Sequence, residues 1–177
     1  AKRVRSARMS NVRWSYPLPI DHGIRSDRGG SGYFMAPRRH GAHNGVDLLA
    51  PIGTPILAAC DGFATSGRRG SFGHWVQLVC PLKTADSTVY YASLFHAHRQ
   101  RTTVPVGKWT PITRRTHVGT VGKTGNASGA RIMPHVHFEL SIHPTREAAR
   151  EYPEVLTEEK VACRKPHPSK SNLSDTP

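Results

Sequence analysis

Residues 135–142 read HVHFELSI and alternate polar and apolar side chains along their whole length. Because successive residues of a β-strand point to opposite faces of a sheet, this segment predicts a half-buried strand. The apolar face would carry Val136, Phe138, Leu140 and Ile142, and the polar face His135, His137, Glu139 and Ser141. His135 and His137 therefore project from one face, where their imidazoles can approach a single small site.

The rest of the chain predicts further short strands around this segment. There are 16 glycines and 14 prolines among 177 residues, which favours short strands and many turns over long helices. The expected elements are a hairpin of 55–59 and 62–66 around Asp61-Gly62, an antiparallel pair of 75–82 and 87–94 across the polar turn 83–86, a brief strand at 118–121, a long loop at 21–42 and a short helix in TREAAREY after Pro144. We therefore expect a mainly β fold, a single domain with a small antiparallel sheet, long loops and few helices.

The length of the chain fits one domain and is too short for two ordinary ones. We expect a basic arm and strap at 1–20, a main domain at 21–144 that includes its N-terminal loop, and a C-terminal helix and tail at 145–177. No apolar run approaches the roughly 20 residues of a membrane-spanning helix, and the start of the sequence has no hydrophobic signal-peptide core. No membrane span is therefore expected, and we expect a monomer.

The charge of the chain calls for an anionic partner. Its formal net charge is +13, from 25 Lys and Arg against 12 Asp and Glu. Nucleic acid, an anionic lipid surface and the acidic polymers of a bacterial wall would all satisfy such a charge. The basic residues are scattered through loops such as Arg38-Arg39 and Arg68-Arg69, without a basic helix or a zinc-finger spacing. This scatter argues against a nucleic-acid-binding module.

A second cluster of polar residues lies in His43-Asn44-Gly45-Val46-Asp47. Gly45 and the nearby Pro51 favour a tight extended segment over a helix here. One carboxylate and two imidazoles, from this segment and from the 135–142 strand, form a donor set that suits Zn²⁺. A fourth position would remain for water, as it does in catalytic zinc sites.

Taken together, these motifs resemble the lysostaphin/LytM-type zinc endopeptidases, which hydrolyse peptide cross-links in bacterial peptidoglycan. The resemblance covers roughly residues 41–144 and rests on HNGVD followed by LLAPIGTPI and AACDG, then GTVGKTGN at 119–126 and PHVHFE at 134–139. It implies a small antiparallel sheet with a narrow groove that carries the zinc site. It also implies that one Zn²⁺ per chain is held by His43, Asp47 and His137, and that His135 belongs to catalysis.

The position of a second catalytic histidine is open to three interpretations. The family usually has Tyr-Ala-His-Leu on the strand before a Val-x-x-Gly turn, and the most literal match, residues 91–94, would place Ser93 at that position. The alternative register starts at His96 and places His98 there. His98 precedes Gly107 by nine positions, which is about the family's spacing to the turn glycine, whereas Ser93 would require an insertion. We therefore favour His98 over Ser93 and His96.

The resemblance further implies a substrate groove beside the glycine-rich segment. Thr124, Asn126 and Arg131 are candidate substrate-binding residues, and Glu139 shares a strand face with His137, so it is a candidate partner for that imidazole. The expected activity is endopeptidase hydrolysis of peptidoglycan by a metal-activated water. The alternative is an inactive member of the same fold that binds the wall or activates another hydrolase.

Three cysteines, Cys60, Cys80 and Cys163, share no C-x-x-C spacing, which argues against a structural zinc site. Cys60 and Cys80 would lie near each other if the segment after Asp61 pairs with the 75–82 strand. A disulfide there would fit the periplasm or a secreted protein, while free buried thiols would give the same sequence pattern. The expected location is periplasmic or secreted.

Overall fold

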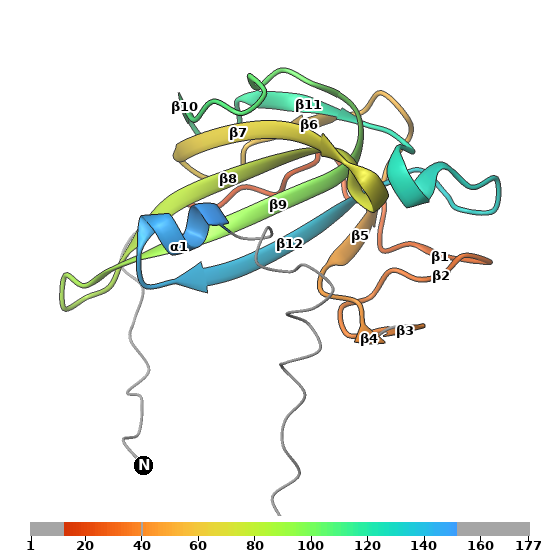
Figure 1. Ribbon diagram of the computed structural model, residues 1–177, viewed down its shortest axis with the longest axis horizontal. Coiled ribbons are helices and arrows are strands. Elements are labelled where there is room, and N and C mark those ends of the chain that lie inside the picture. The colour runs from red at the N-terminus through yellow and green to blue at the C-terminus, as the bar shows by residue number, and fades with distance from the viewer. Residues whose placement is uncertain (1–12, 40, 152–177) are drawn as a thin grey trace, which may run out of the picture.

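One antiparallel sheet of eight strands makes up most of the structure, a computed structural model that describes residues 13–39 and 41–151 (Figure 1). Its strands are β5 (Val46–Leu49), β6 (Pro55–Leu57), β7 (Gly62–Arg69), β8 (Gly73–Lys83), β9 (Val89–Thr102), β10 (Thr110–Ile112), β11 (His117–Val121) and β12 (His135–His143). They follow the order β10-β7-β8-β9-β11-β6, and β12 pairs with both β9 and β5. The expectation of a mainly β fold with a small antiparallel sheet is confirmed.

The longest strands, β8 and β9, form the hairpin that the sequence predicts. In the turn between them, Asp86 accepts hydrogen bonds from the hydroxyl of Thr84 and the backbone N–H of Thr88. Short polar side chains of this kind stabilise tight turns by bonding to nearby backbone. The brief strand expected at 118–121 is confirmed as β11, and the helix after Pro144 as α1 (Arg146–Glu151).

The two faces of the sheet have different compositions. On β8, Val76, Leu78, Cys80 and Leu82 alternate toward the apolar core and are all buried. Residues directly opposite one another share a face, so the register places Thr65, Gln77, Phe95 and Glu139 in one row across β7, β8, β9 and β12 on the other face. Helix α1 covers one end of that second face, where the Ala149 carbonyl accepts a hydrogen bond from Gln77 (Figure 1).

The prediction of a hairpin around Asp61-Gly62 is wrong, because β6 and β7 do not pair with each other. β6 pairs with β11, whereas β7 pairs with β8 and β10. The residues between them are bonded elsewhere: the Ala58 backbone pairs with Thr116 and Arg115, and the Ala59 carbonyl accepts from Ser15. These contacts guide the chain from β6 to β7, which are not neighbours in the sheet. The Asp61 carboxylate accepts a hydrogen bond from the Arg114 backbone N–H and does not close a hairpin.

The 135–142 strand exists as β12, but the burial of its faces is partly reversed. On the apolar face Val136 is buried, whereas Leu140 and Ile142 are each 52% exposed. On the polar face His135, His137 and Glu139 are buried. Only the first four residues of β12 pair with β5, so the second half of the strand leaves the core. His135, His137 and Glu139 are buried because they belong to a cluster of polar side chains at this end of β12.

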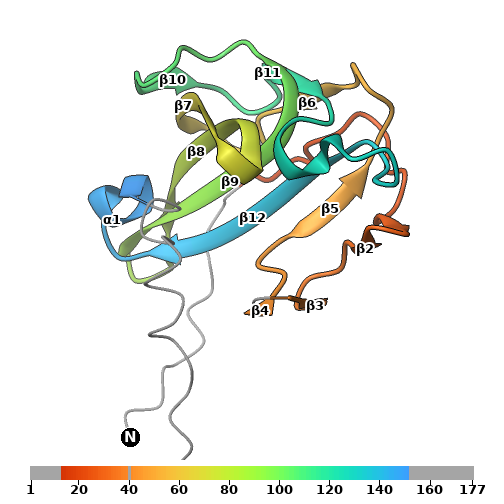
Figure 2. The ribbon, with the colours of Figure 1, turned by 45° about the vertical axis from the view of Figure 1, so that its right-hand side comes forward.

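The loop expected at 21–42 contains four very short strands, β1 (Ser26–Asp27), β2 (Gly30–Ser31), β3 (Pro37–Arg38) and β4 (Gly41–Ala42). They pair as β1 with β2 and β3 with β4, and both views place them beside β5 (Figure 1, Figure 2). Before them, Leu18 reaches the core. Most of the expected basic arm, the end of the expected tail and Cys163 lie outside the described residues.

Cys60 and Cys80 form a disulfide, with Cα atoms 6.3 Å apart. Both residues are buried in the core, and the bond joins the start of the β7 segment to β8. Over residues 13–39 and 41–151, no helix reaches the length and apolarity that crossing a membrane requires.

Candidate metal centre

The pairing of β5 with β12 places Asp47 directly opposite His137. His43 lies just before β5, and its Nε2 is 3.1 Å from Oδ1 of Asp47. Oδ1 is also 2.9 Å from Nδ1 of His137. Close approach of this segment to β12 requires Gly45, because a Cβ there would lie 2.5 Å from the Phe138 carbonyl oxygen. The expected ligand set His43, Asp47 and His137 is therefore brought together, with its donor atoms within 4.8 Å of one another and all three residues buried.

The four histidines at the site have their outward nitrogens bonded to acceptors. His43, His98 and His135 place Nδ1 on the carbonyl oxygens of Tyr33, Thr124 and Met133, at 2.9, 2.9 and 2.7 Å, and His137 places Nε2 2.7 Å from a Glu139 carboxylate oxygen. A carbonyl oxygen only accepts hydrogen bonds, so the nitrogen that faces it carries the proton. In the neutral rings, the inward nitrogens then present lone pairs to the site.

This arrangement fits a bound cation. Nε2 of His43 and Nδ1 of His137 lie 3.0 Å apart, and both face Oδ1 of Asp47. Three acceptor atoms at this separation repel one another unless a proton or a metal ion lies between them. Two imidazoles and a carboxylate are the donor types that Zn²⁺ selects, and hydrogen-bonded outer nitrogens are typical of metal-ligating histidines.

Arg25, a site residue that no motif of the sequence indicates, holds the other oxygen of Asp47. Its Nε and one terminal nitrogen lie 3.0 and 2.9 Å from Oδ2, and its other terminal nitrogen is 2.6 Å from Asp27. Arg38 approaches the same oxygen at 3.9 Å. Arg25 lies here because its backbone N–H donates a hydrogen bond to the carbonyl of Asp47 in β5. The Asp47 carboxylate is therefore fixed with Oδ1 turned toward the histidines.

His98 reaches the site through an irregularity in β9. Opposite β8, the register shifts between the His74–Arg99 and Val76–His96 pairs, and His98 has a left-handed backbone with φ of +60°. An extra residue of this kind forms a β-bulge and interrupts the alternation of faces. His98 consequently turns toward the site, with its ring centroid 5.1 Å from that of His135 and 5.9 Å from that of His137.

The structure does not place the two alternative residues in the site. His96 is fully buried on the core face, with its ring 5.1 Å from Phe138. Ser93 lies further along β9, opposite Ser141, and accepts a hydrogen bond from Gln77.

The buried site shifts the pKa of Asp47, His98, His135 and His137. Burial opposes ionisation of Asp47, but its contacts with the His137 and His43 rings outweigh this penalty and lower its pKa well below the ordinary value. Burial likewise disfavours charged His137, and hydrogen bonds to Asp47 and Glu139 raise its pKa to about 9. Burial, followed by the nearby His135 and His137, lowers the pKa of His98 to about 3. Burial also lowers the pKa of His135.

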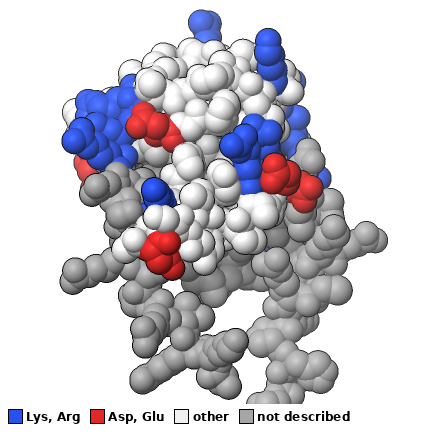
Figure 3. Space-filling model, turned by 90° about the vertical axis from the view of Figure 1, so that its left-hand side faces the viewer, with Lys and Arg blue, Asp and Glu red and all other residues white. Residues whose placement is uncertain are grey.

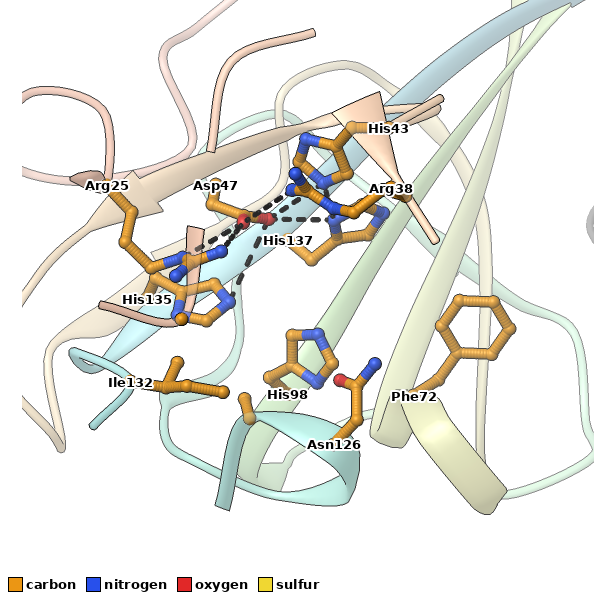
Figure 4. A pocket seen from close by; sticks show the side chains of 12 residues that line it. Arg25, Arg38, His43, Asp47, Phe72, His98, Asn126, Ile132, His135 and His137 are labelled. Carbon is orange, nitrogen blue, oxygen red and sulfur yellow. Dashed lines mark hydrogen bonds and ion pairs between the residues drawn. The ribbon is translucent and has the colours of Figure 1, made fainter. Parts of the chain in front are cut away.

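These side chains line a pocket of about 250 Å³ (Figure 4). His43, His137 and His135 are turned toward the Asp47 carboxylate, and His98 and Asn126 lie on the facing wall. Thr124 lies outside the lining, where its carbonyl orients His98 and its hydroxyl bonds to the Arg99 carbonyl. Arg131 is exposed and also lies outside the lining. Of the candidate substrate-binding residues, Asn126 alone faces the pocket.

Comparison with known families gives one match to this region. Residues 41–149 match the family described as Peptidase family M23. This range includes His43, Asp47, His98, Asn126, His135 and His137.

Two curated relatives share this part of the chain. The Vibrio cholerae protein "Peptidoglycan DD-endopeptidase ShyC" is 33% identical over 103 residues, which are 58% of this chain and 21% of that protein. The Neisseria meningitidis serogroup B protein "DD-carboxypeptidase/endopeptidase Mpg" is 34% identical over 116 residues, 63% of this chain and 23% of that protein. The chain thus spans less than a quarter of the length of either relative.

A solved structure shares the fold. The "zinc containing peptidase from vibrio cholerae" superposes with a TM-score of 0.51 at 23% identity, over 77% of this chain and 37% of that one. At this identity the likeness concerns the arrangement of strands.

Proposed function

The chain belongs to peptidase family M23, and from this premise we propose that it is a zinc endopeptidase that hydrolyses peptide cross-links of bacterial peptidoglycan. The observation that carries the proposal is the buried cluster of four imidazoles and one carboxylate whose inward nitrogens converge on one pocket. Both relatives are named as endopeptidases, which supports the reaction class, and the name of the Vibrio cholerae relative supports peptidoglycan as the substrate.

We assign the role of zinc ligands to His43, Asp47 and His137, with one ion per chain. When bound, Zn²⁺ would supply a Lewis acid and a water of lowered pKa. Glu139 and the Tyr33 carbonyl keep the outer nitrogens of His137 and His43 protonated, so their inner nitrogens are available to a metal. Arg25 holds Oδ2 of Asp47, which leaves Oδ1 for the ion.

His135 and His98 are the proposed proton-handling residues. Each has Nδ1 bonded to a carbonyl, so Nε2 faces the pocket as a proton acceptor. Because burial favours their neutral forms, one of them can accept a proton from the attacking water. That histidine can then pass the same proton to the leaving amine, and the second, when protonated from solvent, would stabilise the developing oxyanion. Asn126, on the same wall as His98, is the proposed contact to the substrate.

The alternative, an inactive wall-binding member of the family, is not favoured. Such a protein would be expected to lack parts of the ligand set, whereas the three ligands, His135 and His98 are all in place. We further propose that the protein acts in the periplasm or outside the cell, where a disulfide such as Cys60–Cys80 persists.

The test is mass spectrometry of the fragments released from purified peptidoglycan by zinc-loaded protein. We expect peptide cross-links to be opened and about one zinc to be bound per chain. His137→Ala should abolish both zinc binding and fragment release, while His98→Ala should bind zinc and release at least 100-fold less. His143→Ala, which changes a half-buried histidine of the same strand, is the matched control. Release of fragments by His137→Ala would overturn the proposal.

A further inference from the structure

A second pocket, of about 240 Å³, lies beside the metal centre. Its walls are aromatic, formed by Phe72, Trp75, Phe95 and Trp109. The Trp75 indole lies against the backbone of Gly67, where a Cβ would come within 2.4 Å of the ring. Phe95 packs between Trp75 and Phe72, with ring centroids 5.7 and 5.0 Å away. Phe72, Trp75 and Phe95 are therefore positioned by the short helix η1 (Gly70–Phe72), β8 and β9, and Trp109 lies just before β10.

The second pocket continues the first. Phe72, which lies at the edge of the first pocket in Figure 4, lines both pockets. Thr65, Gln77 and Phe95 of the second pocket lie in the same row across the sheet as Glu139, which bonds to His137. A polymer that leaves the metal centre across Phe72 would enter the second pocket.

Two arginines at this pocket have no anionic partner. Among residues 13–39 and 41–151, the side chains of Arg69 and Arg150 form no ion pair and no hydrogen bond. Arg69 is exposed at the end of β7. Arg150 stacks on Trp109, with the guanidinium carbon 4.8 Å from the ring centroid. Two buried groups at the pocket are unsatisfied within the described part of the chain: Nε of Arg150 and the hydroxyl of Thr65, a residue that is 5% exposed.

Resting on the proposed function, we propose that this pocket is a substrate subsite that binds a carboxylate-bearing part of the peptidoglycan stem peptide. The unsatisfied groups are donors and cations, which select an anionic acceptor. The aromatic walls would pack against the aliphatic part of the same peptide. The planar guanidinium of an arginine can stack on an aromatic ring and bind a carboxylate through two parallel hydrogen bonds.

The first experiment compares two forms of one soluble cross-linked muropeptide, with its free carboxylates intact or converted to carboxamides. We expect amidation to raise KM for the zinc-loaded wild type about 10-fold and to change kcat little, because the contact lies away from the reacting bond. Arg150→Gln should raise KM for the intact form by a similar factor and should no longer distinguish the two forms.

Arg146→Gln is the matched control. Arg146 lies on the same helix and stacks on Phe63 and Tyr91, outside the pocket lining. This variant should keep the wild-type preference for the free carboxylate. Arg69→Gln, at an exposed position where folding is not at risk, should weaken the preference about threefold. An unchanged preference in both Arg150→Gln and Arg69→Gln would overturn the subsite.

A binding measurement separates this inference from the proposed function. Titration of an uncross-linked soluble stem peptide into metal-free protein, followed by tryptophan fluorescence, reports on Trp75 and Trp109 without hydrolysis. Saturable quenching that is weakened by amidation and by Arg150→Gln supports the subsite even in the absence of activity. If hydrolysis is present but both substrate forms bind and react equally, the subsite is wrong while the proposed function stands. If neither form is cleaved by zinc-loaded protein, the proposed function fails.

Discussion

At the scale of single residues, Arg25 is the clearest determinant of how Asp47 is presented to a metal. Its two bonds to Oδ2 hold the carboxylate in place, and its third bond ties it to Asp27. Asp27 in turn accepts hydrogen bonds from the backbone of Gly29 and Met133, next to His135. The chain before the family motifs thus connects both halves of the site.

We expect Arg25→Gln to lower zinc affinity about 10- to 100-fold, the effect typical of losing an outer-shell partner of a metal ligand. The measurement is competition for zinc against a chelator, with circular dichroism to confirm the fold. Arg38→Gln is the control, because Arg38 lies 3.9 Å from the same oxygen and its side chain is about one third exposed. If Arg25→Gln and wild type bound zinc with equal affinity, Arg25 would have no role in positioning Asp47 for the metal.

The motifs predict the ligands better than they predict the residues that support them. Spacing and donor chemistry indicate His43, Asp47 and one histidine of the 135–142 strand, the family resemblance selects His137 as that histidine, and Glu139 follows from strand alternation. Arg25 and Asp27 stand two apart in a charged, glycine-rich segment without periodicity, so no local pattern distinguishes them from solvent-exposed residues. Their contact with Asp47 depends on pairing between segments 22 residues apart in sequence.

At the scale of elements, the bulge in β9 decides which histidine serves the site. Strict alternation would place His98 on the same face as His96, which is the core face. The bulge and the left-handed backbone of His98 reverse this placement. Sequence spacing favours His98, but a bulge is not readable from side-chain alternation. The failed hairpin at Asp61-Gly62 has a related cause, since long-range pairing of β6 with β11 overrides a local turn signal.

The left-handed conformation at His98 should appear as strain. A non-glycine residue in this region costs about 1 kcal/mol relative to glycine, so His98→Gly should be about 1 kcal/mol more stable than His98→Ala in urea unfolding. Both variants should be inactive. At His96, in ordinary strand backbone, the order should reverse, with glycine less stable than alanine. Glycine less stable than alanine at both positions would show that the bulge carries no strain.

The Cys60–Cys80 disulfide should stabilise the sheet chiefly through the unfolded chain. It closes a loop with a sequence separation of 20, for which chain entropy predicts about 3 kcal/mol. We expect the Cys60→Ala/Cys80→Ala variant to lose about that much free energy of unfolding. A Cys163→Ser background, common to both proteins, prevents thiol exchange during the measurement. A loss below about 1 kcal/mol would contradict stabilisation through the entropy of the unfolded chain.

At the scale of the whole molecule, the chain carries a formal net charge of +13. On the face shown in Figure 3, Lys and Arg side chains form separate groups with acidic side chains beside some of them. Such a surface attracts an acidic polymer without a single docking patch, and salt screens the attraction. We therefore expect binding to intact peptidoglycan to fall at least 10-fold between about 0.05 and 0.5 M salt.

Hydrolysis of a small uncharged peptide substrate is the control for this salt effect, because it does not require long-range attraction. Its kcat/KM should change less than twofold over the same range. A parallel loss with the small substrate would show that salt acts on the site and not on recruitment.

The stability of the metal-free protein should depend on pH with opposite signs on the two sides of about 6.5. Asp47 and Glu139 raise the pKa of His137 to about 9 against the penalty of burial, so its stabilising charge is complete below pH 6.5 and is lost as pH rises through 9. Burial lowers the pKa of His96 to about 3, so the unfolded chain takes up a proton that the folded chain refuses. That contribution is present above pH 6.5 and is lost progressively as pH falls toward 3.

His96 isolates the acid side of this profile, because it lies on the core face away from the metal pocket. Its neutral ring alone accounts for about 1.4 kcal/mol of stability per pH unit, so wild type should lose at least 2 to 3 kcal/mol between pH 6.5 and 4.5. His96→Leu keeps an apolar side chain against Phe138 and has no proton to gain. Urea unfolding of both chelator-treated proteins at these two pH values should show a smaller loss for the variant, by about 2 to 3 kcal/mol. Identical losses would mean that His96 protonates inside the fold and that the acid sensitivity arises from His98 and His135 instead.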